Sequence, residues 1–441
     1  MRKPSIEQLA PELATAARTV AETLATAGQR AWIVGGAVRD LALGRAPKEV
    51  DMASAAPPEE VEALFTRALP LGRNFGTLLV SAAGCEVELT TFRSEASYSD
   101  GRRPDQVRWG ATLEEDALRR DFTANAMYLD PLTGEFRDPT GGLEDLAGGR
   151  LVTVGGAADR FAEDGLRLLR LARFAAALDL APTAAVLEGA RKAAANLDNV
   201  SRERIAQELE RLLLGPAPVT GLRLLAELDL FSHCLPTWNA LDAELRWQAL
   251  DELELDVAPA DEVAGERLAL GIAILLEADP AAARGACSTG QEELLASLRP
   301  SRLLTRQVHE LWAGRRKLEE FSERAEERTA GRAKRLRLFR GAEWAPTVRL
   351  ARAWRRAQER PERILAALAA EARAISQDEL WPAPLLTAED LKAAGLQPGP
   401  RFGELLEELE DAQLDGELDN RAQAEEWLAL RTGEQSGPDA G

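Results

Sequence analysis

The sequence changes character near residue 150. Before this point, a short apolar stretch at Ala31–Val34 runs directly into two glycines, and strand-like stretches follow at Leu78–Val80 and around Val87 and Leu89. After it, apolar residues recur at helical spacing, as over Arg160–Leu178, and from Leu214 to the end no stretch has the pattern of a strand. The pattern therefore predicts an α+β protein, in which a small α/β unit precedes a long all-helical remainder.

Turns, breakers and apolar spacing predict the local elements. We expect a first helix over residues 6–28 and a helical stretch over Ala117–Met127. A polar loop is expected at Tyr98–Pro104 and a turn at Asp138–Gly142. The remaining predictions are a helix over Val200–Leu214, joints at Gly215–Pro218 and Trp381–Leu386, and a frayed tail over residues 434–441.

Composition narrows the classes of protein. Asp and Glu outnumber Lys and Arg by 73 to 54, and the resulting net charge of −19 by itself argues against a nucleic-acid binder. Three scattered cysteines and two histidines predict a reducing, cytoplasmic environment, no disulfide partner and no histidine-based zinc site. The longest apolar stretch, Leu268–Leu276, is far shorter than the roughly 20 residues of a membrane span, and no signal-like region opens the chain. We therefore expect no association with a membrane.

The first chemically informative motif follows the first predicted strand. Gly35 and Gly36 would let backbone N–H groups approach a phosphate chain closely. Glu49 and Asp51 are two residues apart, so in a strand both carboxylates would point to one face, and Glu88 on a later strand would supply a third. Oxygen donors on one edge suit Mg²⁺, which can activate an attacking hydroxyl and stabilise a leaving pyrophosphate. Taken alone, the same residues also fit a plain turn and a solvated strand edge.

Two further motifs combine arginine with carboxylate and amide groups. Over Arg119–Ala126, Arg and Asn on one helical stretch can meet a triphosphate and a ribose hydroxyl, although an ordinary charged helix start would look the same. Asp164, Arg167, Arg170 and Arg173 recur every three residues and so stay near one helix face. Their acceptors and donor forks can mimic a base edge and select a nucleotide without a nucleic-acid template. A surface salt-bridge ladder is the alternative.

In five ordered blocks, the chain resembles the class II tRNA nucleotidyltransferase and poly(A) polymerase family, in particular its bacterial CCA-adding enzymes. The blocks are Gly35–Gly44, Arg119–Ala126, Asp138–Gly142, Glu163–Arg170 and Ser201–Glu208. The resemblance implies template-independent addition of nucleotides to the 3′ end of tRNA from CTP and ATP, with release of pyrophosphate. It implies, after an N-terminal helix (1–30), a catalytic head (31–150), a nucleotide-selecting neck (151–215), a tRNA-contacting helical body (216–380) and a helical tail (381–441).

Carried over position by position, the resemblance also assigns roles to the motif residues. Glu49 and Asp51 would hold Mg²⁺, assisted by Glu88. Gly36, Arg39 and Arg120 would hold the triphosphate, and Asp121 and Asn125 would lie near the ribose. Asp164 and Arg167 would recognise the base, and Arg170 and Arg173 would support the nucleotide.

Three features bear on which nucleotides are added. The family usually has Asp-x-Asp where this chain has Glu49-Val50-Asp51, and misplacing a carboxylate by about an ångström can cost about 10²-fold in rate. Members that add only CC lack a flexible loop that Tyr98–Pro104 resembles here. The segment Gly72–Gly76 fits the tRNA enzymes better than the poly(A) polymerases. An A-adding tRNA enzyme, a poly(A) polymerase and a non-catalytic RNA-binding descendant stay open as alternatives.

A basic stretch offers a contact for tRNA despite the acidic total. Arginines cluster over residues 332–356, with Trp344 and Trp354 between them. We expect this part of the helical body to follow the acceptor stem by shape and phosphate contact, with a solvated helix face as the alternative. The residues expected to bind RNA are Arg335, Arg337, Arg352 and Arg356.

Overall fold

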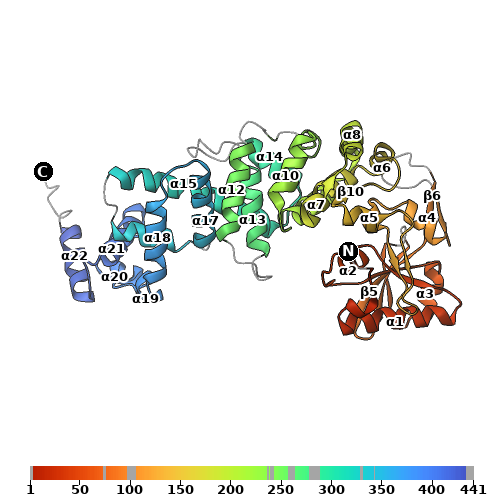
Figure 1. Ribbon diagram of the computed structural model, residues 1–441. Coiled ribbons are helices and arrows are strands. Elements are labelled where there is room, and N and C mark those ends of the chain that lie inside the picture. The colour runs from red at the N-terminus through yellow and green to blue at the C-terminus, as the bar shows by residue number, and fades with distance from the viewer. Residues whose placement is uncertain are drawn as a thin grey trace. The chain divides into compact units, whose positions relative to one another are not determined.

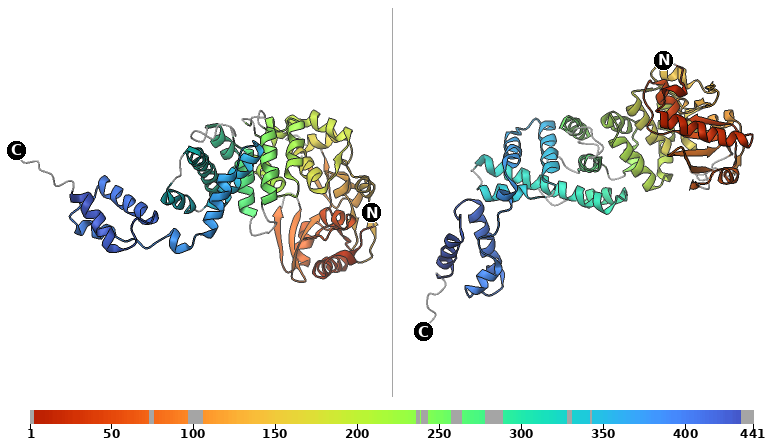
Figure 2. Two further views of the ribbon diagram at one scale, coloured as in Figure 1. Left: turned by 60° about the vertical axis from the view of Figure 1, so that its left-hand side comes forward. Right: turned by 90° about the horizontal axis from the view of Figure 1, so that it is seen from below.

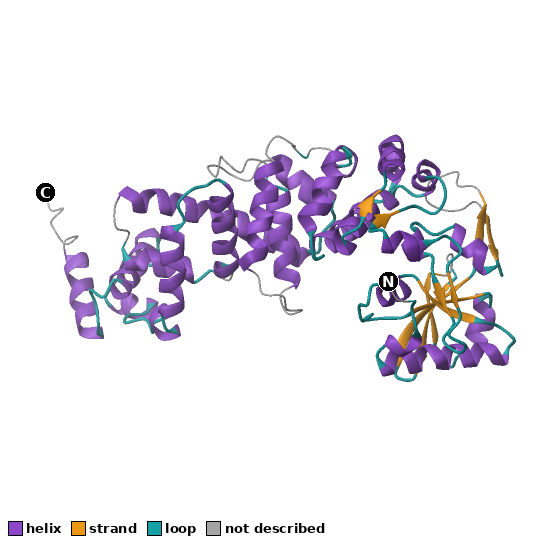
Figure 3. Cartoon of the chain, viewed as in Figure 1, coloured by secondary structure: helices purple, strands orange, loops and turns teal. Residues whose placement is uncertain are grey.

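The computed structural model describes residues 3–72, 76–96, 106–235, 238, 243–256, 264–277, 289–327, 331–341 and 343–433. The chain divides into two compact units, the first made of residues 1–238 and 296–299 and the second of residues 239–295 and 300–441. The strands belong to the first unit, whereas every described element of the second is a helix (Figures 1 and 3). The predicted α+β class is confirmed.

A seven-stranded sheet forms the centre of the first unit, in the order β3-β4-β5-β2-β1-β8-β9. β2 and β5 run parallel, and the other neighbouring strands pair antiparallel. Two small two-stranded sheets pair β6 with β7 and β10 with β11. The strands are β1 (Ala31–Val34), β2 (Asp51–Ser54), β3 (Ala68–Gly72), β4 (Thr77–Ala82), β5 (Cys85–Thr91), β6 (Arg93–Ala96), β7 (Gln106–Trp109), β8 (Tyr128–Leu129), β9 (Phe136–Arg137), β10 (Arg150–Leu151) and β11 (Ala181–Pro182).

The interior strand β1 is buried along its whole length because both of its faces are covered. Helix α1 (Pro11–Thr26) packs against β1, β4 and β5, and Figures 1 and 2 show it lying along the sheet. On the β1 strand, Trp32 and Val34 join a cluster that includes Phe92 and Tyr128. The predicted strand Ala31–Val34 is confirmed, whereas the first long helix starts at Pro11 and not at residue 6, because proline is favoured in the first helical turn.

Helices complete the first unit on both sides of the sheet and after it. They are η1 (Ile6–Gln8), α2 (Gly36–Ala42), α3 (Pro58–Leu64), α4 (Leu113–Leu118), η3 (Thr123–Asn125), α5 (Gly142–Ala147), α6 (Ala157–Glu163), α7 (Leu166–Leu178), α8 (Ala184–Ala193), η4 (Ala194–Asn199), α9 (Arg202–Leu213), α10 (Pro218–Glu227) and α11 (Phe231–Cys234).

The second unit builds its cores from helices alone. One cluster gathers around Leu318, Leu336 and Leu365, and another around Leu391 and Leu409. The helices from residue 243 onward are α12 (Ala243–Asp256), α13 (Ala264–Leu275), α14 (Thr289–Ser297), α15 (Arg302–Glu327), α16 (Arg332–Phe339), α17 (Trp344–Ala357), α18 (Arg363–Ala374), α19 (Gln377–Leu380), α20 (Ala388–Ala393), α21 (Pro400–Leu414) and α22 (Arg421–Gly433).

Two further expectations from the sequence concern membrane-spanning helices and cysteine residues. Across the described ranges, no helix combines the length and the apolar character needed to cross a bilayer. Cys85 and Cys234 are free thiols, and Cys287 lies outside the described residues. The finer division of the chain into head, neck, body and tail stays a prediction.

Candidate active site

The acidic edge of the sheet lies where β2 begins beside β5. Asp51 is the first residue of β2, and its register partner on the parallel neighbour β5 is Glu88. Glu49 lies just before the strand, so the prediction that Glu49 and Asp51 share a strand is wrong. The physical reason is that the antiparallel partner β1 ends at Val34, opposite Asp51, and leaves no strand for residue 49 to pair with. Glu49 and Glu88 are exposed, whereas Asp51 is half-buried.

Electrostatic crowding distinguishes Asp51 from an ordinary surface carboxylate. Burial raises its pKa, the charges of Glu88 and Glu49 raise it further, and Arg120 partly opposes them, so that the pKa reaches about 6. Carboxylate oxygens that repel one another at a partly buried edge are suited to a hard divalent cation such as Mg²⁺. Over the part of the chain that the structure describes, no group of three or more His, Cys, Asp or Glu side chains is arranged to enclose a metal. Such an edge fits a cation that keeps water and substrate phosphates among its ligands.

The turn after β1 brings two guanidinium groups close to the backbone. Gly35 has a φ of +65° and precedes α2, a conformation that glycine adopts without strain. A Cβ atom at Gly35 would lie 3.5 Å from Nη1 of Arg120, and one at Gly36 would lie 3.5 Å from Nη2 of Arg39. The structure therefore brings together Gly35, Gly36, Arg39 and Arg120, as expected for residues that surround a phosphate chain.

Arg120 is held by hydrogen bonds to two buried residues that lie outside the Arg119–Ala126 motif. Its Nη2 donates to Oδ2 of Asp116 at 3.0 Å, and its Nε donates to the Tyr128 hydroxyl at 3.0 Å. The Tyr128 hydroxyl in turn donates to Oδ2 of Asp116 at 2.8 Å. Burial alone would raise the pKa of Asp116, but the charges of Arg120 and Arg119 hold it below its usual range. The available signal was spacing, because Asp116 precedes Arg120 by one helical turn.

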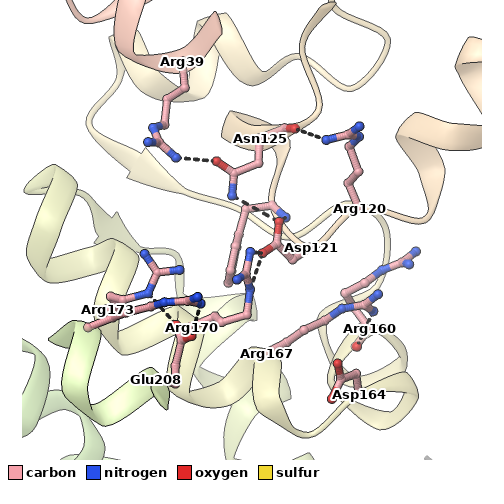
Figure 4. Close-up of polar contacts among 12 residues, drawn as sticks. Arg39, Arg120, Asp121, Asn125, Arg160, Asp164, Arg167, Arg170, Arg173 and Glu208 are labelled. Carbon is pink, nitrogen blue, oxygen red and sulfur yellow. Dashed lines mark hydrogen bonds and ion pairs between the residues drawn. The ribbon is translucent and has the colours of Figure 1, made fainter. Parts of the chain in front are cut away.

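A continuous hydrogen-bonded chain links Arg39 to helix α7, as Figure 4 shows. Arg39 Nη1 donates to Oδ1 of Asn125 at 2.7 Å, and Asn125 Nδ2 donates to Oδ1 of Asp121 at 3.1 Å. The other oxygen of Asp121 accepts from Nε and Nη2 of Arg170, at 2.8 and 2.6 Å. Burial alone would raise the pKa of Asp121, but Arg170 and the hydrogen bonds to its carboxylate lower the pKa to about 2. Arg39, Asn125, Asp121 and Arg170 therefore form one network.

The Arg119–Ala126 motif is not the continuous helix that its sequence predicted. Helix α4 ends at Leu118, Phe122 is extended and forms an isolated bridge with Thr153, and a short 3₁₀ turn follows at η3. The carboxylate of Asp121 accepts from the backbone N–H of Phe122, a local bond that competes with helical geometry. This break lets Arg120 and Asn125 face the same region from different elements.

The predicted helix Arg160–Leu178 is also interrupted, between α6 and α7. Asp164 has an extended backbone (φ −149°, ψ 108°), and Gly165 is the N-cap of α7. As a result, Asp164 lies at a corner, whereas Arg167, Arg170 and Arg173 lie on α7. Arg167 contacts Glu163 and donates from Nη2 to the Arg119 carbonyl at 3.1 Å, and Arg173 pairs with the buried Glu208. The neck (151–215), expected to be all-helical, contains the short strand β11, which pairs with β10.

Two residues of α9 pair with Asp164 and Arg173. Both belong to the Ser201–Glu208 block, whose residues were assigned no role from the sequence. Arg204 binds Asp164 through its two terminal guanidinium nitrogens, with Nη1 at 3.2 Å from Oδ1 and Nη2 at 2.6 Å from Oδ2. Glu208, one turn further along α9, is the partner of Arg173. Their spacing of four residues in the Ser201–Glu208 block was the signal that they share a helix face.

The four arginines expected to bind RNA all have carboxylate partners in the second unit. Arg335 pairs with Glu371, Arg337 with Glu410 and Asp411, and Arg352 and Arg356 share Glu362. Their side chains keep between 20% and 34% exposure, so solvent reaches part of each side chain while its charge is offset locally. Their role toward RNA stays a prediction. The loop at Tyr98–Pro104 and residues 73–75 of Gly72–Gly76 lie outside the described residues.

Comparisons with known proteins match two parts of this chain to described families. Residues 31–152 match the family described as the poly A polymerase head domain, and residues 179–241 match the one described as a probable RNA and SrmB-binding site of polymerase A. The CCA-adding enzyme of Bacillus cereus (strain G9842) is 43% identical over 217 residues, which cover 49% of this chain and 54% of that protein. The CCA-adding enzyme of Limosilactobacillus reuteri (strain DSM 20016) is 41% identical over 235 residues, covering 53% and 58%. The chain thus spans about half the length of the curated relatives that it matches.

Solved structures extend the likeness in fold over nearly the whole chain. A crystal structure of the Bacillus stearothermophilus CCA-adding enzyme in complex with CTP gives a TM-score of 0.73 at 26% identity, covering 97% of this chain and 99% of that chain. The Thermotoga maritima CCA-adding enzyme complexed with tRNA gives 0.68 at 20% identity, covering 97% of both chains, a level that shows the fold alone. The predicted resemblance to the tRNA nucleotidyltransferase and poly(A) polymerase family is confirmed.

Proposed function

We propose that this chain, which carries a poly A polymerase head domain over residues 31–152, is a template-independent tRNA nucleotidyltransferase. It would add the CCA end to tRNA from CTP and ATP and release pyrophosphate. The observation that carries the proposal is the pairing of Asp51 with Glu88 on neighbouring strands of the same head whose Gly35 turn is bordered by Arg120. The likeness of the head to CCA-adding enzymes supports it.

The residues around the Gly35 turn provide the phosphate site. Arg39 and Arg120 are oriented by Asn125, Asp116 and Tyr128 before any ligand binds, so little ordering remains when a triphosphate arrives. Backbone N–H groups at Gly35 and Gly36 can approach the phosphates because neither residue has a side chain. We assign the triphosphate to this turn, and the neighbourhood of the ribose to Asp121 and Asn125.

The acidic edge is the proposed place of reaction. The 3′ hydroxyl of tRNA attacks the α-phosphate, and pyrophosphate leaves in line with it. Asp51 and Glu49 would hold the metal ion, which we propose is Mg²⁺, with Glu88 assisting. When bound, this ion supplies activation of the hydroxyl and neutralisation of the departing charge. The charge crowding at Asp51 supports this assignment, because a divalent cation would relieve it. Arg39 and Arg120 neutralise the negative charge that develops on the leaving pyrophosphate.

We propose that nucleotide selection depends on Asp164 and Arg167, supported by Arg170 and Arg173. Arg170 reaches back to Asp121 and so connects the neck residues with the proposed ribose site. A carboxylate accepts hydrogen bonds from the exocyclic amino group that cytosine and adenine share, whereas uracil and guanine present a carbonyl oxygen at that position. This chemistry favours CTP and ATP together and gives no reason for a polymer of A alone.

The tRNA partner is proposed to contact the helical body through Arg335, Arg337, Arg352 and Arg356. A phosphate would compete with the carboxylates that now pair with these arginines, and each exchange keeps the guanidinium in an ion pair. We place the activity in the cytoplasm, in keeping with the scattered cysteines of the sequence.

Extension of defined tRNA ends tests the proposal. The full chain is incubated with Mg²⁺ and tRNA transcripts that end at the discriminator base, at C or at CC, each with labelled CTP or ATP. CCA addition predicts use of CTP on the two shorter ends and of ATP on the CC end. Use of ATP alone on the CC end would indicate an A-adding enzyme, long A tails on unrelated RNA a poly(A) polymerase, and silence on every substrate a non-catalytic RNA-binding descendant.

A further inference from the structure

The corner between α6 and α7 holds its carboxylate in a fixed position. Asp164 Oδ1 accepts the backbone N–H of Leu166 at 3.0 Å, which ties the side chain to the first turn of α7. A side chain at Gly165 would collide with the backbone of Asn196 in η4, so the corner is packed tightly against its neighbour. The backbone at Asp164 therefore has little room to move.

Arg204 fixes the side chain as well as the backbone. Its two terminal nitrogens face the two oxygens of Asp164, at 3.2 Å and 2.6 Å, and the side chains are only 28% and 19% exposed. A two-point contact between the planar guanidinium and the planar carboxylate sets the rotation of the carboxylate, which one point of contact does not. The hydrogen-bonding capacity of Asp164 that remains is directed away from Arg204.

Helix α9 gives Arg204 a rigid base. Ile205 and Leu209 bury one face of this helix, and α9 packs against α7. One turn beyond Arg204, the buried Glu208 pairs with Arg173 on α7. Arg204 and Glu208 thus hold two of the four residues proposed to recognise the nucleotide. Neither of them was itself predicted to contact the base.

We infer that Arg204 is a positioning residue that sets the discrimination between nucleotides through Asp164. The inference rests on the proposed function and adds to it the residue that makes Asp164 selective. A carboxylate locked by Arg204 presents an acceptor at one position and rejects the carbonyl oxygen of UTP or GTP there. Without the lock the carboxylate rotates, and a base with a carbonyl at this position is tolerated.

The test is the ratio of kcat/KM for CTP to that for UTP, measured on tRNA that ends at the discriminator base. We expect Arg204→Gln to lower this ratio by about tenfold or more, since charge-assisted bidentate contacts are the strong ones. Arg204→Lys keeps the charge but loses the fork, and its ratio should fall between the two. Arg191→Gln is the matched control, because Arg191 lies on α8 in an exposed pair with Glu227 and should keep the wild-type ratio.

A double variant separates positioning from general damage. If Arg204 acts through Asp164, then Arg204→Gln added to Asp164→Asn should leave the ratio of Asp164→Asn unchanged, with thermal midpoints recorded for every variant. An unchanged ratio in Arg204→Gln and Arg204→Lys, or an additive loss in the double variant, would overturn the inference while leaving the proposed function intact. A wild-type chain that incorporates neither nucleotide would instead overturn the proposed function, and the inference with it.

Discussion

At the scale of single residues, Asp121 shows how this site depends on buried charge. Its carboxylate is 8% exposed and is shared by Asn125, Arg170 and the backbone of Phe122. A lone buried carboxylate would be costly, and here the partners more than offset that cost, because the pKa falls to about 2 from an ordinary value of 3.8. The ionised form of Asp121 is thus built into the folded state.

This lowered pKa predicts a pH dependence of stability. Because the folded-state pKa is below the unfolded one, the contribution of Asp121 is complete above about pH 5 and is lost as the pH falls toward 2. The contribution is about 2 kcal/mol at neutral pH and about half of that at pH 3. The measurement is the difference in unfolding free energy between the wild type and Asp121→Asn at several pH values. A difference that stays constant between pH 7 and pH 3 would contradict it.

At the scale of elements, the positions of the site residues depend more on the breaks between helices than on the helices themselves. Strand Ala31–Val34 could be predicted because its four apolar residues end at a glycine pair, and the acidic edge could be located because it follows that strand. The corner at Asp164 could not be predicted, because Arg167, Arg170 and Arg173 follow Asp164 at helical spacing and give no sign of a break. The partners Arg204 and Glu208 could not be assigned either, since their contacts join residues that lie about 40 positions apart and depend on how α9 packs. Spacing predicts local faces, whereas tertiary packing decides which faces meet.

The corner itself predicts the effect of one methyl group. In Gly165→Ala, the added Cβ would meet the Asn196 carbonyl, and rigid backbone on both sides gives it no room. We expect a loss of about 1–3 kcal/mol in unfolding free energy, the usual cost of overpacking. Denaturant unfolding measures it, with Gly403→Ala as the control, because a Cβ at Gly403 in helix α21 meets nothing within 4 Å and alanine favours a helix. Equal stability of the two variants would refute this account of the corner.

At the scale of the whole molecule, an acidic chain is proposed to bind an acidic partner. The net charge of −19 disfavours association with RNA at long range, so binding has to depend on local arginines. The arginines of α16 and α17 are paired with glutamates and aspartate, which keeps them from attracting anions indiscriminately. If RNA binds here as proposed, its phosphates displace these carboxylates, and the affinity should therefore depend on salt through a small number of contacts.

Salt-dependent binding checks the assignment of this surface. Replacing Arg335, Arg337, Arg352 and Arg356 by Gln should weaken tRNA binding and reduce the slope of log affinity against log salt by about one for each arginine that contacts a phosphate. Fluorescence titration of labelled tRNA from low to moderate salt gives the slope. Arg401→Gln, which alters an exposed arginine of α21 paired with Glu404 and Glu408, is the control and should leave it unchanged. A four-fold variant with the wild-type slope would remove these arginines from the interface.

Asp51, paired in register with Glu88, is the proposed place of nucleotide transfer. The direct measurement is the rate of AMP incorporation into tRNA ending in CC, with saturating ATP and Mg²⁺, for the wild type, Asp51→Asn and Glu86→Gln. Glu86 is an exposed carboxylate two residues before Glu88 on β5, and it controls for loss of a negative charge on the strand that pairs with β2. We expect a loss of about 10²-fold or more for Asp51→Asn and an unchanged rate for Glu86→Gln. Wild-type incorporation by a folded Asp51→Asn variant would contradict it.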